Sequence, residues 1–292
     1  MLPEIFTPEL LNTLELFHIQ AKRAYLGTRQ GGHVSIKRGH GIEFSDYRKY
    51  ELGDNPRHID WGVYARSDRL YVKRFQEEQD LSVLIVLDTS ASMVTPTTGK
   101  WEMARNIGLA LAWIALMQQD TVTMAAPGHL VVPRASGARA IHHLGARFSE
   151  LNVDGRGDFL DSVRQAINAI RFPGVAIFIS DLLMPFADIQ AVFNLMRAKN
   201  LDITAIQVLS PEDLEPLKGT EEAVVVDSET GEEIPISLSG AQRGEYEFLL
   251  EQHNRRLSEL FAGGRISFTR VRSDEPLSDV VINNLPRTGL IK

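Results

Sequence analysis

A carboxylate and two hydroxyl groups follow an apolar run in the middle of the chain. The run Leu81-Ser-Val-Leu-Ile-Val-Leu87 ends at Asp88, and Ser90 and Ser92 follow at alternate positions, so that their side chains can turn toward one point. A second apolar run ends in the same way, at Asp181. Oxygen ligands that carry few formal charges suit Mg²⁺, which keeps several waters and accepts an outside carboxylate. The spacing indicates a candidate metal site, while a helix cap at Asp88 stays the structural alternative.

The segments around these residues predict an α/β fold with an open, doubly wound and mostly parallel sheet. A continuous apolar run is typical of a central strand that is buried on both faces. Strands are expected over 81–87, 174–180, 201–209 and 265–271. Segments with helical periodicity alternate with them, over 99–118, 137–150, 158–171, 185–199, 241–262 and 276–285. In sheets of this class ligands bind beyond the carboxyl ends of the strands, where Asp88 and Asp181 are expected.

Two hairpins interrupt this alternation. The residues 121–126 and 130–133 flank Pro127-Gly128-His129, a turn signal that predicts an antiparallel hairpin at the edge of the sheet. The acidic stretch 211–239 predicts a small hairpin insertion on the surface.

The N-terminal part is predicted to be an extension of a helix and a strand. Helical spacing of leucines covers 8–27, and an alternating pattern covers 69–76. Between them, the residues 42–61 mix aromatic and charged side chains without a clear period. We therefore divide the chain into an N-terminal segment over 1–79, expected to pack on the core, and an α/β domain over 80–292.

Composition excludes several classes of protein. The chain has 292 residues, of which 43% are hydrophobic, so it can bury a large core and is not globally disordered. It has no cysteine, which excludes disulfides, zinc–thiolate sites, iron–sulfur clusters and cysteine nucleophiles. A net charge of −7 disfavours nucleic-acid binding. We find no transmembrane or signal segment, and expect a cytoplasmic protein.

The pattern D-x-S-x-S after an apolar strand resembles the first loop of a von Willebrand factor type A domain. In that family the loop helps to build a metal-ion-dependent adhesion site for Mg²⁺, with Mn²⁺ as an alternative. The resemblance implies that Asp88, Ser90 and Ser92 are first-loop ligands and that Asp181 is the third-loop aspartate, which acts through water. The second loop normally supplies a threonine. Gly157 stands at that position here, which leaves Asp158 or a water to replace the missing ligand.

The N-terminal part carries a second resemblance, to the signature of the bacterial domain of unknown function 58 (DUF58) family. The signature covers residues 30–95, and its residues include Glu43, Phe44, Asp46, Tyr47, Arg48, Tyr50, Gly53, Asp54, Arg57, Asp60, Trp61 and Arg66. The rest of the chain suits the type A domain of that family. Members of that family are similar to adaptor or chaperone-like proteins that act with MoxR-type AAA+ ATPases. The resemblance implies a MoxR-type ATPase as the partner of this chain.

The charged and aromatic residues of this signature alternate along the chain. Charges close to aromatic rings are expected to be partly buried, and buried charges need partners. A planar arginine can bind a carboxylate with two hydrogen bonds and stack on a ring. We therefore favour an internal network of ion pairs and rings that clamps this segment onto the α/β domain. A partner-docking surface made of the same residues is the alternative.

These observations favour a non-enzymatic protein-interaction module. The chain has no G-x-x-x-x-G-K-[ST] loop, no G-x-S-x-G elbow and no H-E-x-x-H pair. The metal would bind an Asp or Glu side chain of a partner, the MoxR-type ATPase. A metal-independent scaffold that docks through the N-terminal segment is the second hypothesis. A divalent-metal hydrolase centred on Asp88, Asp158 and Asp181 ranks lowest.

Overall fold

The chain divides into two compact units. The computed structural model describes residues 2–21, 43–76, 81–95, 97–128, 130–151, 153, 159–170, 174–215, 222–226, 233–237 and 240–292. The large unit comprises Met1–Ala24 and Leu81–Lys292, and the small unit comprises Tyr25–Asp80. The sequence analysis grouped residues 1–24 with the N-terminal segment. They belong to the large unit instead, because Leu10 and Leu14 are buried in its core. The expected packing of the remaining segment on that core stays a prediction.

A six-stranded sheet forms the centre of the large unit. Its strand order is β10-β7-β6-β3-β4-β5. The strands are β3 Ser82–Leu87, β4 Thr121–Ala126, β5 Leu130–Ser136, β6 Gly174–Ser180, β7 Asp202–Leu209 and β10 Ser267–Arg272. All neighbours pair in parallel except β4 and β5, which form an antiparallel hairpin at the edge. The predicted mostly parallel sheet and its edge hairpin are confirmed.

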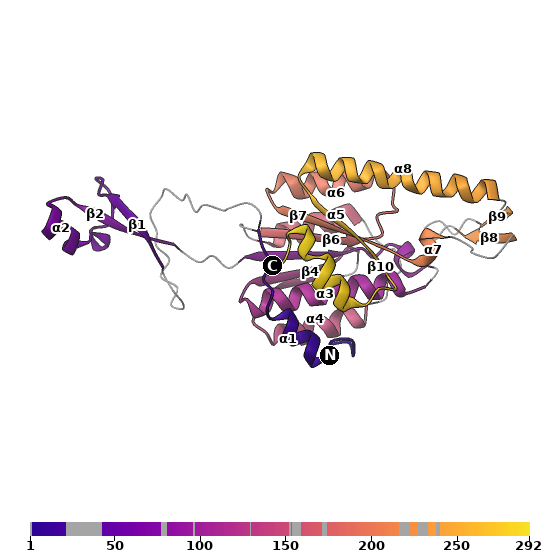
Figure 1. Cartoon of the computed structure of the whole chain (residues 1–292), viewed down its shortest axis with the longest axis horizontal. Coiled ribbons are helices and arrows are strands. Elements are labelled where there is room, and N and C mark those ends of the chain that lie inside the picture. The colour runs from indigo at the N-terminus through magenta and orange to yellow at the C-terminus, as the bar shows by residue number, and fades with distance from the viewer. Residues whose placement is uncertain are drawn as a thin grey trace. The chain divides into compact units, whose positions relative to one another are not determined.

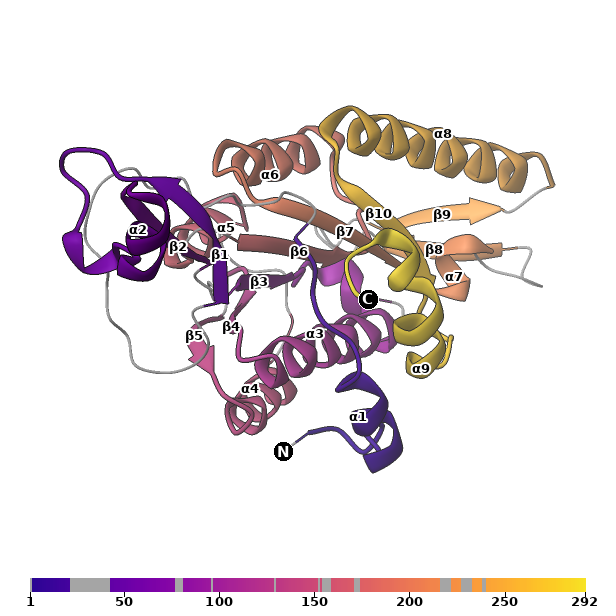
Figure 2. The ribbon, with the colours of Figure 1, turned by 60° about the vertical axis from the view of Figure 1, so that its left-hand side comes forward.

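Helices cover both faces of this sheet (Figures 1 and 2). One face carries α1 Pro8–Leu14, α3 Gly99–Met117, α4 Ala140–Ser149 and α9 Leu277–Asp279, and the other carries α5 Phe159–Ala169, α6 Phe186–Ala198 and α8 Gly240–Gly264. The side chains of β3 alternate between the two hydrophobic clusters, with Ile85 in one and Leu84 and Val86 in the other. This alternation explains why the strand is apolar at every position.

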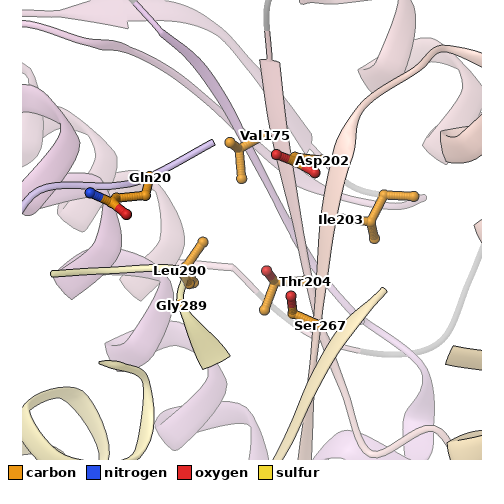
Figure 3. Close-up of a pocket in the computed structure, with 8 residues that line it drawn as sticks. All are labelled: Gln20, Val175, Asp202, Ile203, Thr204, Ser267, Gly289 and Leu290. Atoms are coloured by element: carbon orange, nitrogen blue, oxygen red, sulfur yellow. The ribbon is translucent and has the colours of Figure 1, made fainter. Parts of the chain in front are cut away.

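The segment after α1, residues 18–20, lies side by side with the C-terminal residues 290–292 near the starts of strands β6, β7 and β10. The predicted helix over 8–27 is wrong over residues 15–21, because a turn follows Leu14 and Ile19 then pairs with Ile291. Residues 22–27 of that prediction lie outside the described residues. Gln20 donates its backbone N–H to the carbonyl of Leu290 at 2.8 Å. Figure 3 shows a cavity between these segments and the strand starts, with a volume of about 10 Å³, enough for one water.

The C-terminal region and the insertion also differ in detail from their predictions. The expected helix over 276–285 is the short α9 followed by a π-helical turn, Val280–Asn284, and a 3₁₀ turn, Pro286–Thr288. The stretch predicted as a surface hairpin begins instead with a helical turn, α7 Pro211–Leu214. Its hairpin strands are β8 Glu222–Val226 and β9 Glu233–Ser237.

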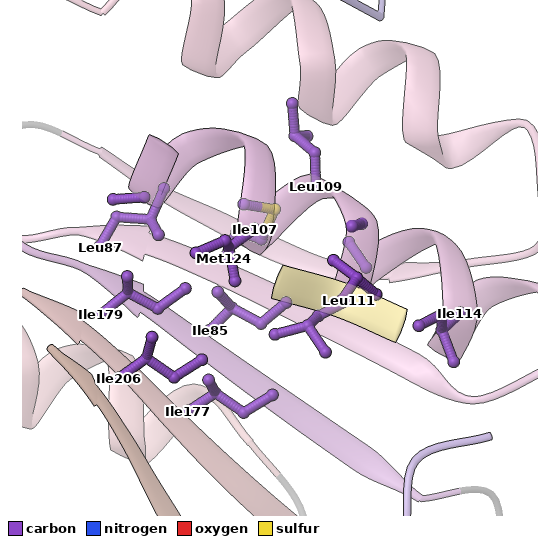
Figure 4. Packing of buried hydrophobic residues seen from close by; sticks show 14 of the residues in the cluster. Ile85, Leu87, Ile107, Leu109, Leu111, Ile114, Met124, Ile177, Ile179 and Ile206 are labelled. Carbon is purple, nitrogen blue, oxygen red and sulfur yellow. The ribbon is translucent and has the colours of Figure 1, made fainter. Parts of the chain in front are cut away.

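Helix α3 packs closely on the central strands, and this packing fixes where the helix begins. Figure 4 shows Ile107, Leu111 and Ile114 above the isoleucines of the sheet. Gly108 allows the close approach, because a Cβ at that position would lie 3.0 Å from Cδ2 of Leu87. The first turn of α3 is therefore held at the carboxyl edge, the edge at which the parallel strands end.

The small unit is an antiparallel pair of strands with a short helix. Strand β1 Glu43–Lys49 pairs with β2 Tyr71–Gln76, and a 3₁₀ turn, Pro56–His58, and α2 Trp61–Ser67 lie between them in the chain. The sequence analysis missed β1. A register shift between Phe44 and Asp46 interrupts the period of two that would have revealed the strand. Among the described helices of both units, none has the length and apolar character needed to cross a bilayer.

Replacing Leu14 with alanine tests whether α1 is an integral part of the large unit. Leu14 is fully buried, so we expect the free energy of unfolding to fall by about 3 kcal/mol in urea denaturation. Leu16, which is 80% exposed, is the matched control, and its replacement by alanine is expected to cost less than about 0.5 kcal/mol. Equal effects of the two substitutions would show that α1 contributes nothing to the core.

Candidate functional site

Two buried aspartates follow neighbouring strands at the carboxyl edge. Strands β3 and β6 pair in parallel with Leu87 opposite Ile179, so Asp88 and Asp181 come directly after adjacent strands. The backbone N–H of Asp88 donates to the carbonyl of Ile179 at 2.9 Å. The hydroxyl of Ser180 donates to Oδ2 of Asp88 at 2.5 Å. Both aspartates are fully buried, so the structure brings together the first-loop and third-loop carboxylates at one edge.

The first loop holds two hydroxyl groups at a distance that suits a small cation. Oδ1 of Asp88 accepts the backbone N–H of Ser90 at 2.8 Å, and a 3₁₀ turn, Ala91–Val94, follows. The hydroxyl oxygens of Ser90 and Ser92 lie 3.0 Å apart and are partly exposed. Adjacent ligands of an octahedral Mg²⁺, each about 2.0–2.1 Å from the ion, lie about 2.9 Å from each other. The serine pair therefore fits two neighbouring ligand positions.

Burial changes the acidity of Asp88. It raises the pKa of this carboxyl from 3.8 to about 6, and the negative charge of Asp181 adds to the shift. Hydrogen bonds from Ser180 and Ser90 act in the opposite direction. A bound cation would offset both the burial and the repulsion, so the electrostatics of the edge favour one.

A buried cation that was not predicted from the sequence, Lys100 at the start of α3, contacts the loop that follows β6. Oδ1 of Asp181 accepts a hydrogen bond from the backbone N–H of Leu183 at 3.2 Å, and Oδ2 accepts one from Nζ of Lys100 at 3.0 Å. Lys100 is only 1% exposed. Its Nζ also lies 3.1 Å from each carboxylate oxygen of Asp213, in α7. We call Lys100, Asp181 and Asp213 the ion cluster.

Residues of helix α8 and strand β7 form polar contacts with the loop after β6 and with α7. Leu182 has a positive φ of 56°, which is strained for leucine, and its carbonyl lies 2.6 Å from Nε2 of His253. Nε2 of Gln207 donates to the carbonyl of Asp181 at 3.0 Å. The hydroxyl of Tyr246 donates to the carbonyl of Asp213 at 2.7 Å, and burial and the charge of Asp213 raise the pKa of Tyr246 to about 12. The loop is thus fixed by polar contacts on several sides.

Part of the predicted ligand set lies outside the described residues. This applies to Gly157 and Asp158 of the second loop, so the replacement of the threonine ligand stays a prediction. Among the described residues, no group of three or more His, Cys, Asp or Glu side chains could hold a metal. The candidate site therefore depends on the serine pair beside a carboxylate.

The small unit contains several of the contacts expected for the signature. Arg48 forms ion pairs with Asp54 at 2.5 Å and with Glu51 at 3.1 Å. The hydroxyl of Tyr47 donates to Asp60 at 2.9 Å, and Asp60 also caps α2. Within this unit, these pairs link the turn and the helix to strand β1.

Other signature residues lie on the surface of the small unit or outside the description. Trp61 is 61% exposed. Arg57 and Arg66, for which partial burial was expected, are exposed as well, and Nε of Arg66 donates to the carbonyl of Gly62. Gly53 forms a turn with a φ of 109°, and the backbone N–H of Tyr50 binds the carbonyl of Leu70. The side chains of Glu43, Phe44 and Asp46 are outside the described set, and the role of the signature stays a prediction.

A family model covers most of the chain. Residues 46–256 match the family described as "Protein of unknown function DUF58", and the chain belongs to that family. Uncharacterized proteins of Mycobacterium tuberculosis and Mycobacterium bovis are each 27% identical to it over 296 residues, covering 95% of this chain and 90% of theirs.

Solved structures show a weaker likeness. BatB from Bacteroides thetaiotaomicron matches 72% of this chain and 98% of its own, with 14% identity and a TM-score of 0.42. An aerotolerance-related membrane protein from Bacteroides fragilis matches 70% of this chain and 97% of its own, with 17% identity and a TM-score of 0.42.

The raised pKa of Asp88 predicts a pH dependence of stability in metal-free buffer. Between pH 3.8 and about 6 the folded protein keeps a proton that the unfolded chain releases. This contribution is complete below the unfolded pKa and is lost as the pH rises through about 6. We expect the free energy of unfolding of the wild type, relative to Asp88→Asn, to fall by on the order of 2 kcal/mol from about pH 4 to about pH 8. Parallel pH profiles from urea denaturation of the two proteins would contradict this.

Proposed function

We propose that this chain is a non-enzymatic protein-interaction module, and that its large unit is a von Willebrand factor type A domain with a metal-ion-dependent adhesion site. The observation that carries the proposal is the serine pair. The hydroxyls of Ser90 and Ser92 lie 3.0 Å apart beside the buried Asp88, next to the strand that ends at Asp181. This set of oxygens fits Mg²⁺ or Mn²⁺.

Each residue of the site has a distinct role in this proposal. Ser90 and Ser92 would hold the ion directly. Asp88 and Asp181, which are fully buried behind the serine pair and held by hydrogen bonds from the protein, would balance its charge through waters. The ion would supply an open position that attracts an Asp or Glu side chain of a partner. Binding would therefore require both a divalent cation and a carboxylate.

The geometry of this site suits binding of a partner better than hydrolysis of a substrate. A general base needs a carboxylate oxygen within reach of a water or substrate. Asp88 and Asp181 are both fully buried, which keeps their carboxylate oxygens away from a substrate at the surface.

The partner in this proposal is the MoxR-type AAA+ ATPase that the family resemblance implies, and the cytoplasmic location is part of the same proposal.

Calorimetric titration with Mg²⁺ and Mn²⁺ tests the metal part. We expect the wild type to bind and Asp88→Ala to show no heat of binding, because the variant loses the charge nearest to the serine pair. Asp274→Ala is the matched control, since Asp274 follows the edge strand β10 at the same edge but forms its ion pair with Arg272. The control is expected to bind like the wild type. Flat titrations of the wild type would remove the metal from the proposal.

A pull-down with the MoxR-type ATPase tests the partner. We expect capture in Mg²⁺ and loss of capture in EDTA or with Asp88→Ala. Capture that survives EDTA would favour the second candidate function, metal-independent docking through the small unit. The exposed side chains of Leu52, Trp61 and Tyr64 support that candidate. In that case Trp61→Ala, rather than Asp88→Ala, would abolish capture.

A further inference from the structure

The ammonium of Lys100 lies in a place where a lysine is not stable by itself. It belongs to the first turn of α3, where the helix dipole disfavours a positive charge. It is also 1% exposed, and an isolated buried charge is strongly unfavourable. The contacts with Asp181 at 3.0 Å and with Asp213 at 3.1 Å are what stabilise it there.

Hydrogen bonds that do not involve Lys100 hold Asp213 in place. Its Oδ2 accepts the backbone N–H of Ser210 at 2.8 Å, and the hydroxyl of Ser210 accepts the backbone N–H of Asp213 at 3.1 Å. The hydroxyl of Tyr246 holds the carbonyl of the same residue. These bonds preorganise α7, so that Asp181 and Asp213 together hold the ammonium of Lys100.

The charges at the edge do not cancel. Asp88 interacts with Asp181 electrostatically, and Asp181 and Asp213 share Lys100. Among the described residues, Lys100 is the one cation that pairs with any of these carboxylates, and it pairs with Asp181 and Asp213 but not with Asp88. The set therefore keeps a negative charge that a divalent cation at Ser90 and Ser92 would neutralise, while the ammonium repels such a cation.

We propose that Lys100 is a built-in cation of this site, which balances Asp181 when no metal is bound and limits the affinity of the site for divalent cations. This inference rests on the proposed metal site and adds the residue that tunes it. Lys100 is a positioning residue: it acts through Asp181 and touches neither the metal nor the partner. A lysine with only a structural role would change stability and leave the cation affinity unchanged.

Titration calorimetry of the full chain with Mn²⁺ tests this inference with two variants. Lys100→Met removes the ammonium, and Lys100→Gln removes the charge but keeps N–H donors for the two carboxylates. A unit charge near a divalent cation in a partly buried site changes its binding by about tenfold or more. We expect the folded variants to bind Mn²⁺ at least about tenfold more tightly than the wild type. We also expect Mn²⁺ to raise their thermal midpoints more than that of the wild type. Lys100→Gln keeps the test decisive where Lys100→Met does not fold.

The outcomes separate this inference from the proposed function. If the wild type shows no heat of Mn²⁺ binding while Lys100→Gln binds tightly, the built-in cation is supported and metal binding by the natural protein is overturned. Binding by the wild type with equal or weaker binding by both variants overturns the built-in cation and leaves the proposed function intact. Flat titrations of all three proteins overturn both. Adding Asp88→Ala to Lys100→Gln is expected to abolish the gain, and a gain that persists would place the cation elsewhere and overturn the inference.

Discussion

A buried ammonium between two aspartates connects three parts of the large unit that are distant in the sequence. Lys100 is 81 residues from Asp181 and 113 residues from Asp213. Removing one member of such a buried cluster leaves the others unpaired, which typically costs about 3–5 kcal/mol. The cluster therefore joins the first turn of α3, the end of β6 and α7 into one arrangement. Asp181 of this cluster follows the strand next to β3, which ends at Asp88 beside the serine pair.

Hydrophobic burial places the charges that the cluster must satisfy. Strands β3 and β6 are buried along their whole length, and each ends at an aspartate. Because the strands are parallel neighbours, the same packing that builds the core brings both carboxylates to one edge. The cost appears in the pKa of Asp88, which burial and Asp181 raise to about 6. Lys100 balances Asp181 and Asp213, and a divalent cation beside Ser90 and Ser92 would offset the cost at Asp88.

The strands and residues that depend on a local pattern could be predicted from the sequence. The apolar runs and their terminal aspartates gave β3, β6 and the edge at which Asp88 and Asp181 meet. Lys100 was missed because a lysine in a predicted helix resembles a solvent-exposed residue, and the aspartates that bury it are far along the chain. Asp213 was missed for the same reason, although Ser210 and Asp213 carry the pattern of a capping box. The end of α1 at Leu14 could not be predicted either, because Ile19 pairs with Ile291, which is distant in the sequence.

In the proposed arrangement, one edge of the sheet holds two cations of different kinds, a fixed ammonium and an exchangeable divalent ion. Anomalous X-ray scattering from crystals of the wild type soaked in Mn²⁺ would locate the divalent ion. We expect one Mn²⁺ peak about 2 Å from both hydroxyl oxygens of Ser90 and Ser92. We also expect Nζ of Lys100 to remain in contact with Asp181. A peak at the position of a displaced Lys100, or no peak beside the two serines, would contradict this arrangement.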